Sequence, residues 1–91
     1  MNEKSLVRSW IRDTTRNKVR YYSVVDAIAG IVATKNPRDY WYHVKNRPMN
    51  EHGLQLSTLC RQLRLKGKDG KYYLTDCTTK AGMRTILSHL P

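Results

Sequence analysis

Two segments of this chain carry side chains that can bind phosphate or hydrogen-bond the edge of a nucleobase. At about 100° per residue, one arc of a predicted helix holds Arg38, Tyr42, Lys45 and Asn46. Arginine and lysine pair with phosphates and with guanine edges, and the asparagine amide pairs with adenine. This arc is therefore a candidate surface for contact with a nucleic acid. The alternative is a solvated face, which is the usual place of charged residues on a helix.

The second segment is a lysine-rich loop. Lys66, Lys68 and Lys71 surround Gly67 and Gly70, with an Asp-Gly dipeptide at the tip. Flexible ammonium groups and open backbone amides at a hairpin tip suit contact with the backbone of a duplex. The lysines could instead keep an exposed sheet edge soluble. The glycine spacing does not match a nucleotide-binding loop, because the G-x-x-x-x-G-K-[ST] pattern and its following helix are missing.

The whole chain is strongly basic. Seventeen Lys and Arg residues against seven Asp and Glu residues give a formal charge of +10, and the excess is spread over residues 8 to 20, 35 to 47 and 61 to 71. If folding gathers these segments on one side, the surface attracts phosphate backbones by releasing condensed counterions. We therefore expect DNA as the first partner. A membrane is not expected as a partner, because no basic amphipathic helix with a broad Leu, Phe or Trp face is present.

Length and motifs argue against several other classes. A chain of 91 residues is expected to form one domain, residues 1 to 91. It has no apolar run near the roughly 18 to 20 residues of a membrane span and no secretion signal, so we expect a cytoplasmic protein. Cys60 and Cys77 are expected as reduced thiols, with a disulfide as the alternative. His43, His52 and His89 lack the paired spacing of zinc ligands, so no metal and no other cofactor is expected.

Catalysis is not expected either. Asp26, Asp39 and Asp76 are spaced as helix caps or strand ends, whereas a metal-dependent nuclease needs clustered carboxylates. No Ser-His-Asp or Cys-His arrangement stands out in the sequence. A chain of this length also has little room for a substrate pocket.

The candidate arc requires a helix with a defined start. Asn36 can cap the free amides, Pro37 fits the first helical position and Asp39 can reach back from the third. These signals predict a helix from 37 to about 47. The opposite arc of this helix should be buried and consists of Pro37, Tyr40, Trp41 and Val44.

Another helix is predicted just before it. Ser23 and Asp26 form a capping-box pattern ahead of an apolar arc, which predicts a helix from 24 to about 33. The arc consists of Val24, Val25, Ile28, Ile31 and Val32. Residues 34 to 36 form so short a connection that the two helices must pack at an angle, as in a helix-turn-helix. In such a unit the second helix can lie in the major groove of DNA.

Two β-hairpins and a final helix complete the expected fold. Period-two alternation predicts a strand over residues 4 to 12, a turn over 13 to 17 and a returning strand over 18 to 22. A second hairpin joins residues 61 to 66 and 72 to 75 through the lysine-rich loop. Residues 54 to 60 fit either a strand or a single helical turn. Thr78 or Thr79 caps a last helix with core positions Met83, Ile86, Leu87 and Leu90. The expected class is α+β, with two β-hairpins, a central helix pair and a C-terminal helix.

Several phrases, taken in order, resemble the N-terminal domain of the BRO family. They are Tyr22-Ser23-Val24-Val25-Asp26, Asn36-Pro37-Arg38-Asp39-Tyr40-Trp41-Tyr42, Leu56-Ser57-Thr58-Leu59-Cys60-Arg61-Gln62-Leu63 and Asp69-Gly70-Lys71 through Leu74-Thr75-Asp76-Cys77. The resemblance covers about residues 10 to 90. It implies a DNA-binding module such as those of phage antirepressors, baculovirus repeat proteins and bacterial DNA-damage-inducible proteins of the D type.

Two departures from this family pattern are visible. Similar family members continue beyond the position of Pro91, so the resemblance predicts either a trimmed module or a stand-alone short protein. The phrase Lys80-Ala81-Gly82-Met83-Arg84 replaces the acidic and aromatic residues common in the family. The last helix is therefore more basic than its family counterparts.

The alternative to DNA binding is a protein-interaction module that sequesters a repressor or a recombination protein. Its anchors would be exposed aromatic residues such as Trp10, Tyr21 and Tyr40, because Trp, Tyr and Arg dominate interface energies. These rings could instead fill the core. A homodimer is also expected to be feasible, because two hairpins leave open strand edges.

Overall fold

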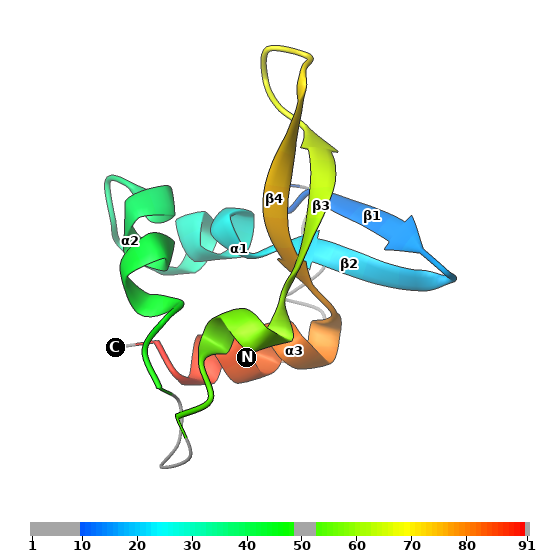
Figure 1. The fold of residues 1–91 in the computed structure, drawn as a ribbon. Coiled ribbons are helices and arrows are strands. Elements are labelled where there is room, and N and C mark those ends of the chain that lie inside the picture. The colour runs from blue at the N-terminus through cyan, green and yellow to red at the C-terminus, as the bar shows by residue number, and fades with distance from the viewer. Residues whose placement is uncertain (1–9, 49–52, 91) are drawn as a thin grey trace.

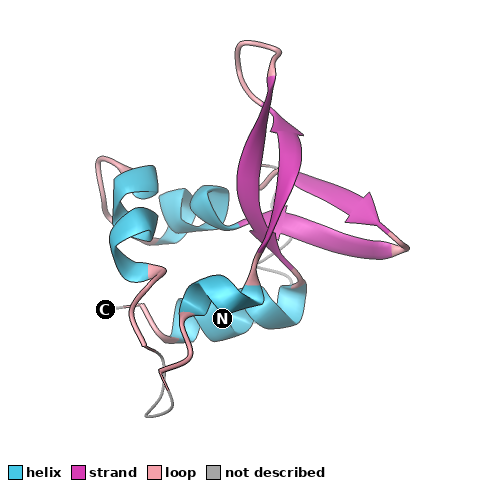
Figure 2. Ribbon diagram, in the orientation of Figure 1, coloured by secondary structure: helices cyan, strands magenta, loops and turns pink. Residues whose placement is uncertain are grey.

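A computed structural model describes residues 10 to 48 and 53 to 90 of the protein (Figures 1 and 2). The described elements follow in chain order as β1 (Asp13–Arg16), β2 (Val19–Ser23), α1 (Val24–Ile31), α2 (Pro37–Val44), the 3-10 helix η2 (Leu56–Leu59), β3 (Arg61–Lys66), β4 (Tyr72–Thr78) and α3 (Lys80–Ser88). The expected α+β class, with two hairpins, a helix pair and a C-terminal helix, is confirmed.

The two hairpins share one curled antiparallel sheet. Its strand order is β1-β2-β4-β3, so β1 and β3 are the edge strands. Strand pairing joins the hairpins at Tyr22 with Thr78 and at Ser23 with Cys77. Beyond this short junction they diverge: the β3–β4 hairpin stands upright in Figure 1, and the β1–β2 hairpin points to the right. Residues 72 to 75 of β4 therefore pair with β3 alone.

The predicted bounds of the first hairpin are wrong. Residues 10 to 12 lie outside any strand, and β1 begins at Asp13, inside the segment predicted as a turn. Residues 4 to 9 of the predicted strand lie outside the described part of the chain. The turn is formed by Asn17 and Lys18, whose φ angles are 51° and 66°. Two successive left-handed residues make the tight turn that matches the twist of a hairpin, and they move the turn toward the C-terminus.

The second hairpin is confirmed. β3 covers residues 61 to 66 as predicted, and β4 runs to Thr78, three residues further than the predicted end at 75. Gly70, at the tip, has a φ of 84°, which a glycine adopts without strain. The ambiguous segment before β3 is the helical turn η2.

The predicted helix caps are confirmed, but two of the predicted helices end early. Ser23, Asn36 and Thr79 accept hydrogen bonds from the backbone amides of Asp26, Asp39 and Gly82 at 3.3, 3.1 and 3.2 Å. α1 ends at Ile31 instead of 33, and α2 ends at Val44 instead of 47. Lys45 and Asn46 therefore follow α2 in a turn.

Neither Asp26 nor Asp39 accepts a hydrogen bond from the backbone amide of its cap residue, as a complete capping box would require. The amide of Asn36 donates to Thr34 Oγ1 at 3.3 Å, and Asp39 instead faces His43 at 3.3 Å. The amide of Ser23 donates to the Arg12 carbonyl at 2.9 Å, which frees the Asp26 carboxylate for another partner.

The main core lies between the helices and the sheet junction. It contains Ile28, Trp41, Met83 and Ile86 among other buried residues, and Tyr40, Leu87 and Leu90 pack against it. The predicted buried arcs of α2 and α3 are thereby confirmed. Ile31 was expected on the buried arc of α1 but is 42% exposed, because α1 ends there.

A smaller cluster lies inside the curl of the sheet. It consists of Leu63, Leu65 and Cys77, with Tyr21 packed against it. Both cysteines are free thiols, as expected. Burial raises the pKa of Cys77 to about 11 and that of Cys60 to about 12, so both stay protonated and unreactive near neutral pH.

Thr78 leaves no room for a side chain at Gly82, in the first turn of α3. A Cβ atom at Gly82 would overlap with Thr78 Oγ1, which is buried and donates to the Leu59 carbonyl at 2.7 Å. Alanine gains about 1 kcal/mol of helix propensity, but overpacking of this kind typically costs about 1–3 kcal/mol or more. We expect Gly82→Ala to lower the free energy of unfolding by up to roughly 2 kcal/mol net in urea titrations.

Thr78→Ala provides the background that tests the cause. Without the hydroxyl, the nearest atom to a Cβ at Gly82 is the Thr78 Cβ at 3.3 Å. Gly82→Ala should then be neutral or stabilising. An equal loss in both backgrounds would show that the overlap is not the reason.

Candidate nucleic-acid interface

A hollow of about 310 Å³ separates α2 from the open side of β4. Arg38, Tyr42 and Lys45 line it from the α2 side, and the β4 side is formed by Tyr73, Leu74, Thr75 and Asp76. The hairpin curves away from α2 above the sheet junction, which leaves room for side chains of both elements. The predicted polar arc of α2 therefore faces the β3–β4 hairpin.

A second hollow lies under the hairpin tip. Arg38 lines it together with Lys66 and Lys68, and Arg12 and Tyr73 are also in its wall. Arg12, Arg38 and Tyr73 border both hollows, so the two are adjacent. Five of the residues predicted from the sequence are thus brought together: Arg38, Tyr42, Lys45, Lys66 and Lys68. We call the walls of the two hollows, with the hairpin tip at residues 66 to 71, the α2–hairpin surface.

The other two predicted residues lie outside these hollows. Asn46 follows the end of α2, and its Oδ1 accepts a hydrogen bond from Ser57 Oγ at 3.4 Å. Lys71 is exposed at the hairpin tip, where its carbonyl accepts from the Gly67 amide at 2.7 Å. Lys71 stays close to Lys66 and Lys68 along the chain, whereas Asn46 lies beyond the C-terminal end of α2.

Lys45 is held by Asp76 instead of being presented. Its Nζ lies 3.3 Å from Asp76 Oδ2, which also accepts the indole N–H of Trp41 at 2.8 Å. The Lys45 side chain is 23% exposed and that of Asp76 is 13% exposed. Lys45 Nζ also lies 5.6 Å from the centroid of the Tyr42 ring. Lys45 is therefore only partly exposed, and a carboxylate 31 residues away along the chain neutralises it.

Arg12 anchors the same surface from below. Its Nε and Nη2 donate to the two oxygens of Asp26 at 2.8 and 3.0 Å, and its Nη1 donates to the Lys66 carbonyl at 3.2 Å. The hydrogen bonds to Asp26 raise the pKa of Arg12. One side chain therefore ties the start of α1 to the upper end of β3. Sequence reasoning missed this role, because Arg12 was placed in a strand and Asp26 in a capping box.

Asp69 shapes the tip of the hairpin. It accepts the phenolic hydrogen of Tyr73 and the amide hydrogen of Lys71. These bonds lower the pKa of Asp69, and the same contact raises the pKa of Tyr73. The carboxylate thus fixes the loop conformation while Lys68 and Lys71 remain exposed on either side of it.

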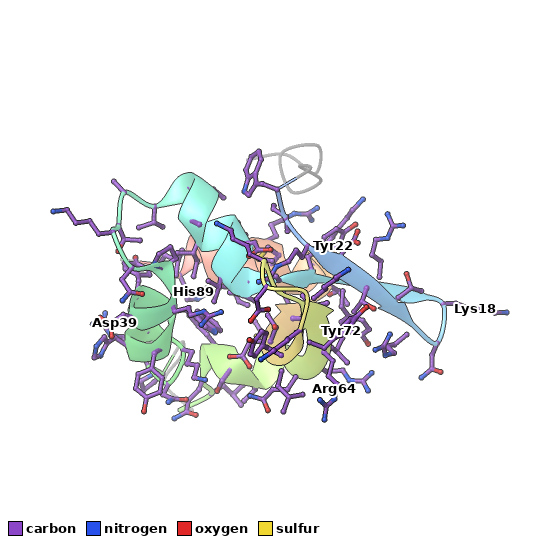
Figure 3. The ribbon with its side chains drawn as sticks, turned by 90° about the horizontal axis from the view of Figure 1, so that it is seen from above. Lys18, Tyr22, Asp39, Arg64, Tyr72 and His89 are labelled. Carbon is purple, nitrogen blue, oxygen red and sulfur yellow. The ribbon has the colours of Figure 1, made fainter. Side chains whose placement is uncertain are left out.

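The basic residues do not all converge on this surface. Arg16, Lys18 and Arg20 belong to the β1–β2 hairpin, and Figure 3 shows Lys18 at its far tip, on the opposite side from Asp39 of α2. Arg61 lies over the Tyr21 ring, with its Cζ 5.4 Å from the ring centroid. Arg38 of the basic segment 35 to 47 meets Lys66 and Lys68 of the segment 61 to 71, but the part of the segment 8 to 20 that forms the β1–β2 hairpin does not join them.

The predicted aromatic anchors differ in exposure. Trp10 is 47% exposed, and its Nε1 donates to the Asp26 carbonyl at 3.2 Å. Tyr40 packs against the main core, and Tyr21 packs against the smaller cluster. Only Trp10 of these three therefore presents a large apolar surface.

The described residues contain no group of His, Cys, Asp and Glu side chains suited to hold a metal ion. Within residues 10 to 48 and 53 to 90, none of the helices has the length and apolar character needed to cross a membrane. Comparison of the chain with protein-family models, with curated proteins and with solved structures finds no match.

Proposed function

We propose that the chain is a DNA-binding domain of a phage antirepressor-like or DNA-damage-inducible-like regulatory protein, and that it binds duplex DNA through the α2–hairpin surface. The observation that supports this most strongly is the second hollow, where Arg38 of α2 meets Lys66 and Lys68 of the hairpin. Cations from separate segments thus share one concave wall that can hold a phosphate backbone, and the acids in this wall, Asp26 and Asp69, are bonded to Arg12 and Tyr73. The resemblance to the BRO family N-terminal domain supports the same reading.

The contributions of the cations to binding should differ. Lys66, Lys68 and Lys71 hold phosphates, and Arg38 reaches the same strand from α2. Lys45 and Arg12 are already paired with Asp76 and Asp26, so they position α2 and the hairpin instead of supplying surplus charge. Tyr42 is 65% exposed beside these cations and can pack against a sugar or base.

A titration of the purified domain against a random duplex and a phage-operator duplex at two salt concentrations tests the proposal. If about five phosphates are neutralised, the log-log slope of affinity against salt is about −4 to −5. Tighter binding of the operator duplex would add sequence specificity to this electrostatic contribution. An affinity that does not change with salt, or no binding at low salt, would contradict the proposal.

A protein-interaction module remains the second candidate, supported by the exposure of Trp10 beside the second hollow. In that case a repressor or recombination protein would co-purify from nuclease-treated lysate, Trp10→Ala would abolish the capture, and no DNA would be shifted. The edge strands β1 and β3 also leave a homodimer feasible. Light scattering of the purified domain measures this directly.

A further inference from the structure

The upper part of one face of the β3–β4 hairpin is open to solvent and unusual in composition, whereas Asp76, lower on the same face, binds Trp41 and Lys45. The register pairs Arg64 with Leu74 and Lys66 with Tyr72, and paired residues of antiparallel strands share a face. Leu74 is 59% exposed and Tyr72 is 61% exposed, whereas Leu63 and Leu65 on the opposite face are buried in the small cluster. We call the face that carries Arg64, Lys66, Tyr72 and Leu74 the outer face. It exposes two large apolar side chains directly beside two cations.

The hairpin also projects from the helical part of the domain. It rises above α1 and α2 in Figure 1, and in the view from above Arg64 points away from the β1–β2 hairpin (Figure 3). The major groove of B-DNA admits a two-stranded β-ribbon as readily as it admits a helix. A projecting two-stranded hairpin is therefore a suitable element to enter the groove.

α2 is poorly placed for the same task. Its polar arc faces β4 across the first hollow, and its Lys45 is bound to Asp76. Asn46, the residue expected to pair with adenine, is hydrogen-bonded to Ser57. A recognition helix needs its base-reading side chains directed outward from the domain. The Arg38, Tyr42 and Lys45 side chains instead line the hollow between α2 and the hairpin.

We infer that the outer face of the β3–β4 hairpin reads base edges in the major groove, with Arg64 on a guanine and Leu74 on the methyl group of a thymine. The inference rests on the proposed function and assigns to this site the element that determines specificity. Arginine fits the two acceptors of guanine with two hydrogen bonds, and an apolar side chain fits the thymine methyl group. Lys68 and Lys71 at the tip and Arg38 on α2 then hold the flanking phosphates.

Dimensions of strand and duplex agree with this placement. Same-face residues of a strand lie about 6.6 Å apart, which is close to two base-pair steps of about 3.4 Å. Opposed residues such as Arg64 and Leu74 have Cβ atoms about 5 Å apart, so they address neighbouring base pairs. The inference therefore predicts a guanine and a thymine at adjacent or next-adjacent positions of the preferred sequence.

The test starts with selection of preferred sequences from a randomised duplex library by the wild-type domain. Arg64→Ala and Leu74→Ala are compared with Arg61→Ala, which removes the same charge from the same strand but on the other face, over Tyr21. Arg64→Ala should reduce discrimination at one guanine position by roughly 5- to 150-fold. Arg61→Ala should leave the preferred sequence unchanged. Arg64 and Leu74 are exposed, so the melting temperatures of their variants should stay near that of the wild type.

Modified bases test which chemical group of each base the protein contacts. Replacing the guanine with 7-deazaguanine removes the N7 acceptor, and replacing the thymine with uracil removes the methyl group. The first change should weaken binding by the wild type but not by Arg64→Ala, and the second should weaken binding by the wild type but not by Leu74→Ala. A preference that survives Arg64→Ala, or that is lost on Asn46→Ala instead, would overturn the inference.

The two proposals fail in distinguishable ways. If the wild-type domain binds duplexes with a steep salt dependence but selects no sequence, the proposed function stands and base reading by the outer face is wrong. If the domain binds no duplex at low salt, both are wrong.

Discussion

Replacing Lys66, Lys68 and Lys71 together with glutamine is expected to lower the affinity for duplex DNA on the order of 100-fold at about 0.15 M salt. Each lysine that neutralises one phosphate releases about 0.9 of a counterion, so the three together should reduce the magnitude of the log-log salt slope by about 2.7. Lys66 and Lys68 line the hollow that Arg38 completes, and Lys71 is exposed at the same tip. Fluorescence anisotropy at several salt concentrations measures both quantities.

A variant of equal charge separates the surface from the net charge. Arg16→Gln, Lys18→Gln and Arg20→Gln remove the same formal charge from the β1–β2 hairpin, which points to the other side of the molecule (Figure 3). This variant should lose no more than about tenfold, because only the long-range field changes, and salt screens that field within about 10 Å. Equal losses in the two variants would mean that DNA binding is not localised to the α2–hairpin surface.

Asp76→Ala is expected to lower the free energy of unfolding by about 3 kcal/mol. The substitution leaves the indole N–H of Trp41 without its acceptor in a residue that is 2% exposed. It also leaves Lys45, 23% exposed, without its carboxylate. Both groups stay partly desolvated, so the loss exceeds that of a surface ion pair. Urea denaturation followed by tryptophan fluorescence gives the value.

Asp13→Ala is the matched control for Asp76. Asp13 forms an ion pair with Arg20 at 3.6 Å, and the two side chains are 41% and 58% exposed. Pairs of this kind contribute about 0–1 kcal/mol, so this variant should unfold nearly as the wild type does. If Asp76→Ala cost no more than Asp13→Ala, the carboxylate would not be what holds α2 against β4.

Much of the local structure could be predicted because it depends on short-range chemistry. The cap at Asn36 and the strand alternation around Leu63 and Leu65 are encoded within a few neighbouring residues. The first hairpin was displaced because its turn uses Asn17 and Lys18 in left-handed conformations, and a lysine there gives no recognisable turn signal. Residues 13 to 18 contain no apolar residue, so no alternation marks the start of β1.

The candidate site could be predicted only in part. The sequence places Arg38 and Lys45 on one arc of a helix, but the partner of that arc depends on packing across the chain. Asp76, which binds Lys45, and Asp26, which binds Arg12, are distant in sequence from the cations they neutralise. No periodic pattern carries such information. The cations that we propose to bind phosphate, Arg38 and the hairpin lysines, could be distinguished from the paired cations Lys45 and Arg12 only once the fold was known.

Mapping the contact surface by NMR tests the central claim most directly. A short duplex is titrated into the ¹⁵N-labelled domain at low salt, and the amide shifts are followed residue by residue. Binding through the α2–hairpin surface predicts the largest changes at Arg38, around Arg64 and over residues 66 to 71, with little change at Asn17 and Lys18. The largest changes at the tip of the β1–β2 hairpin, or none anywhere at saturating duplex, would contradict it.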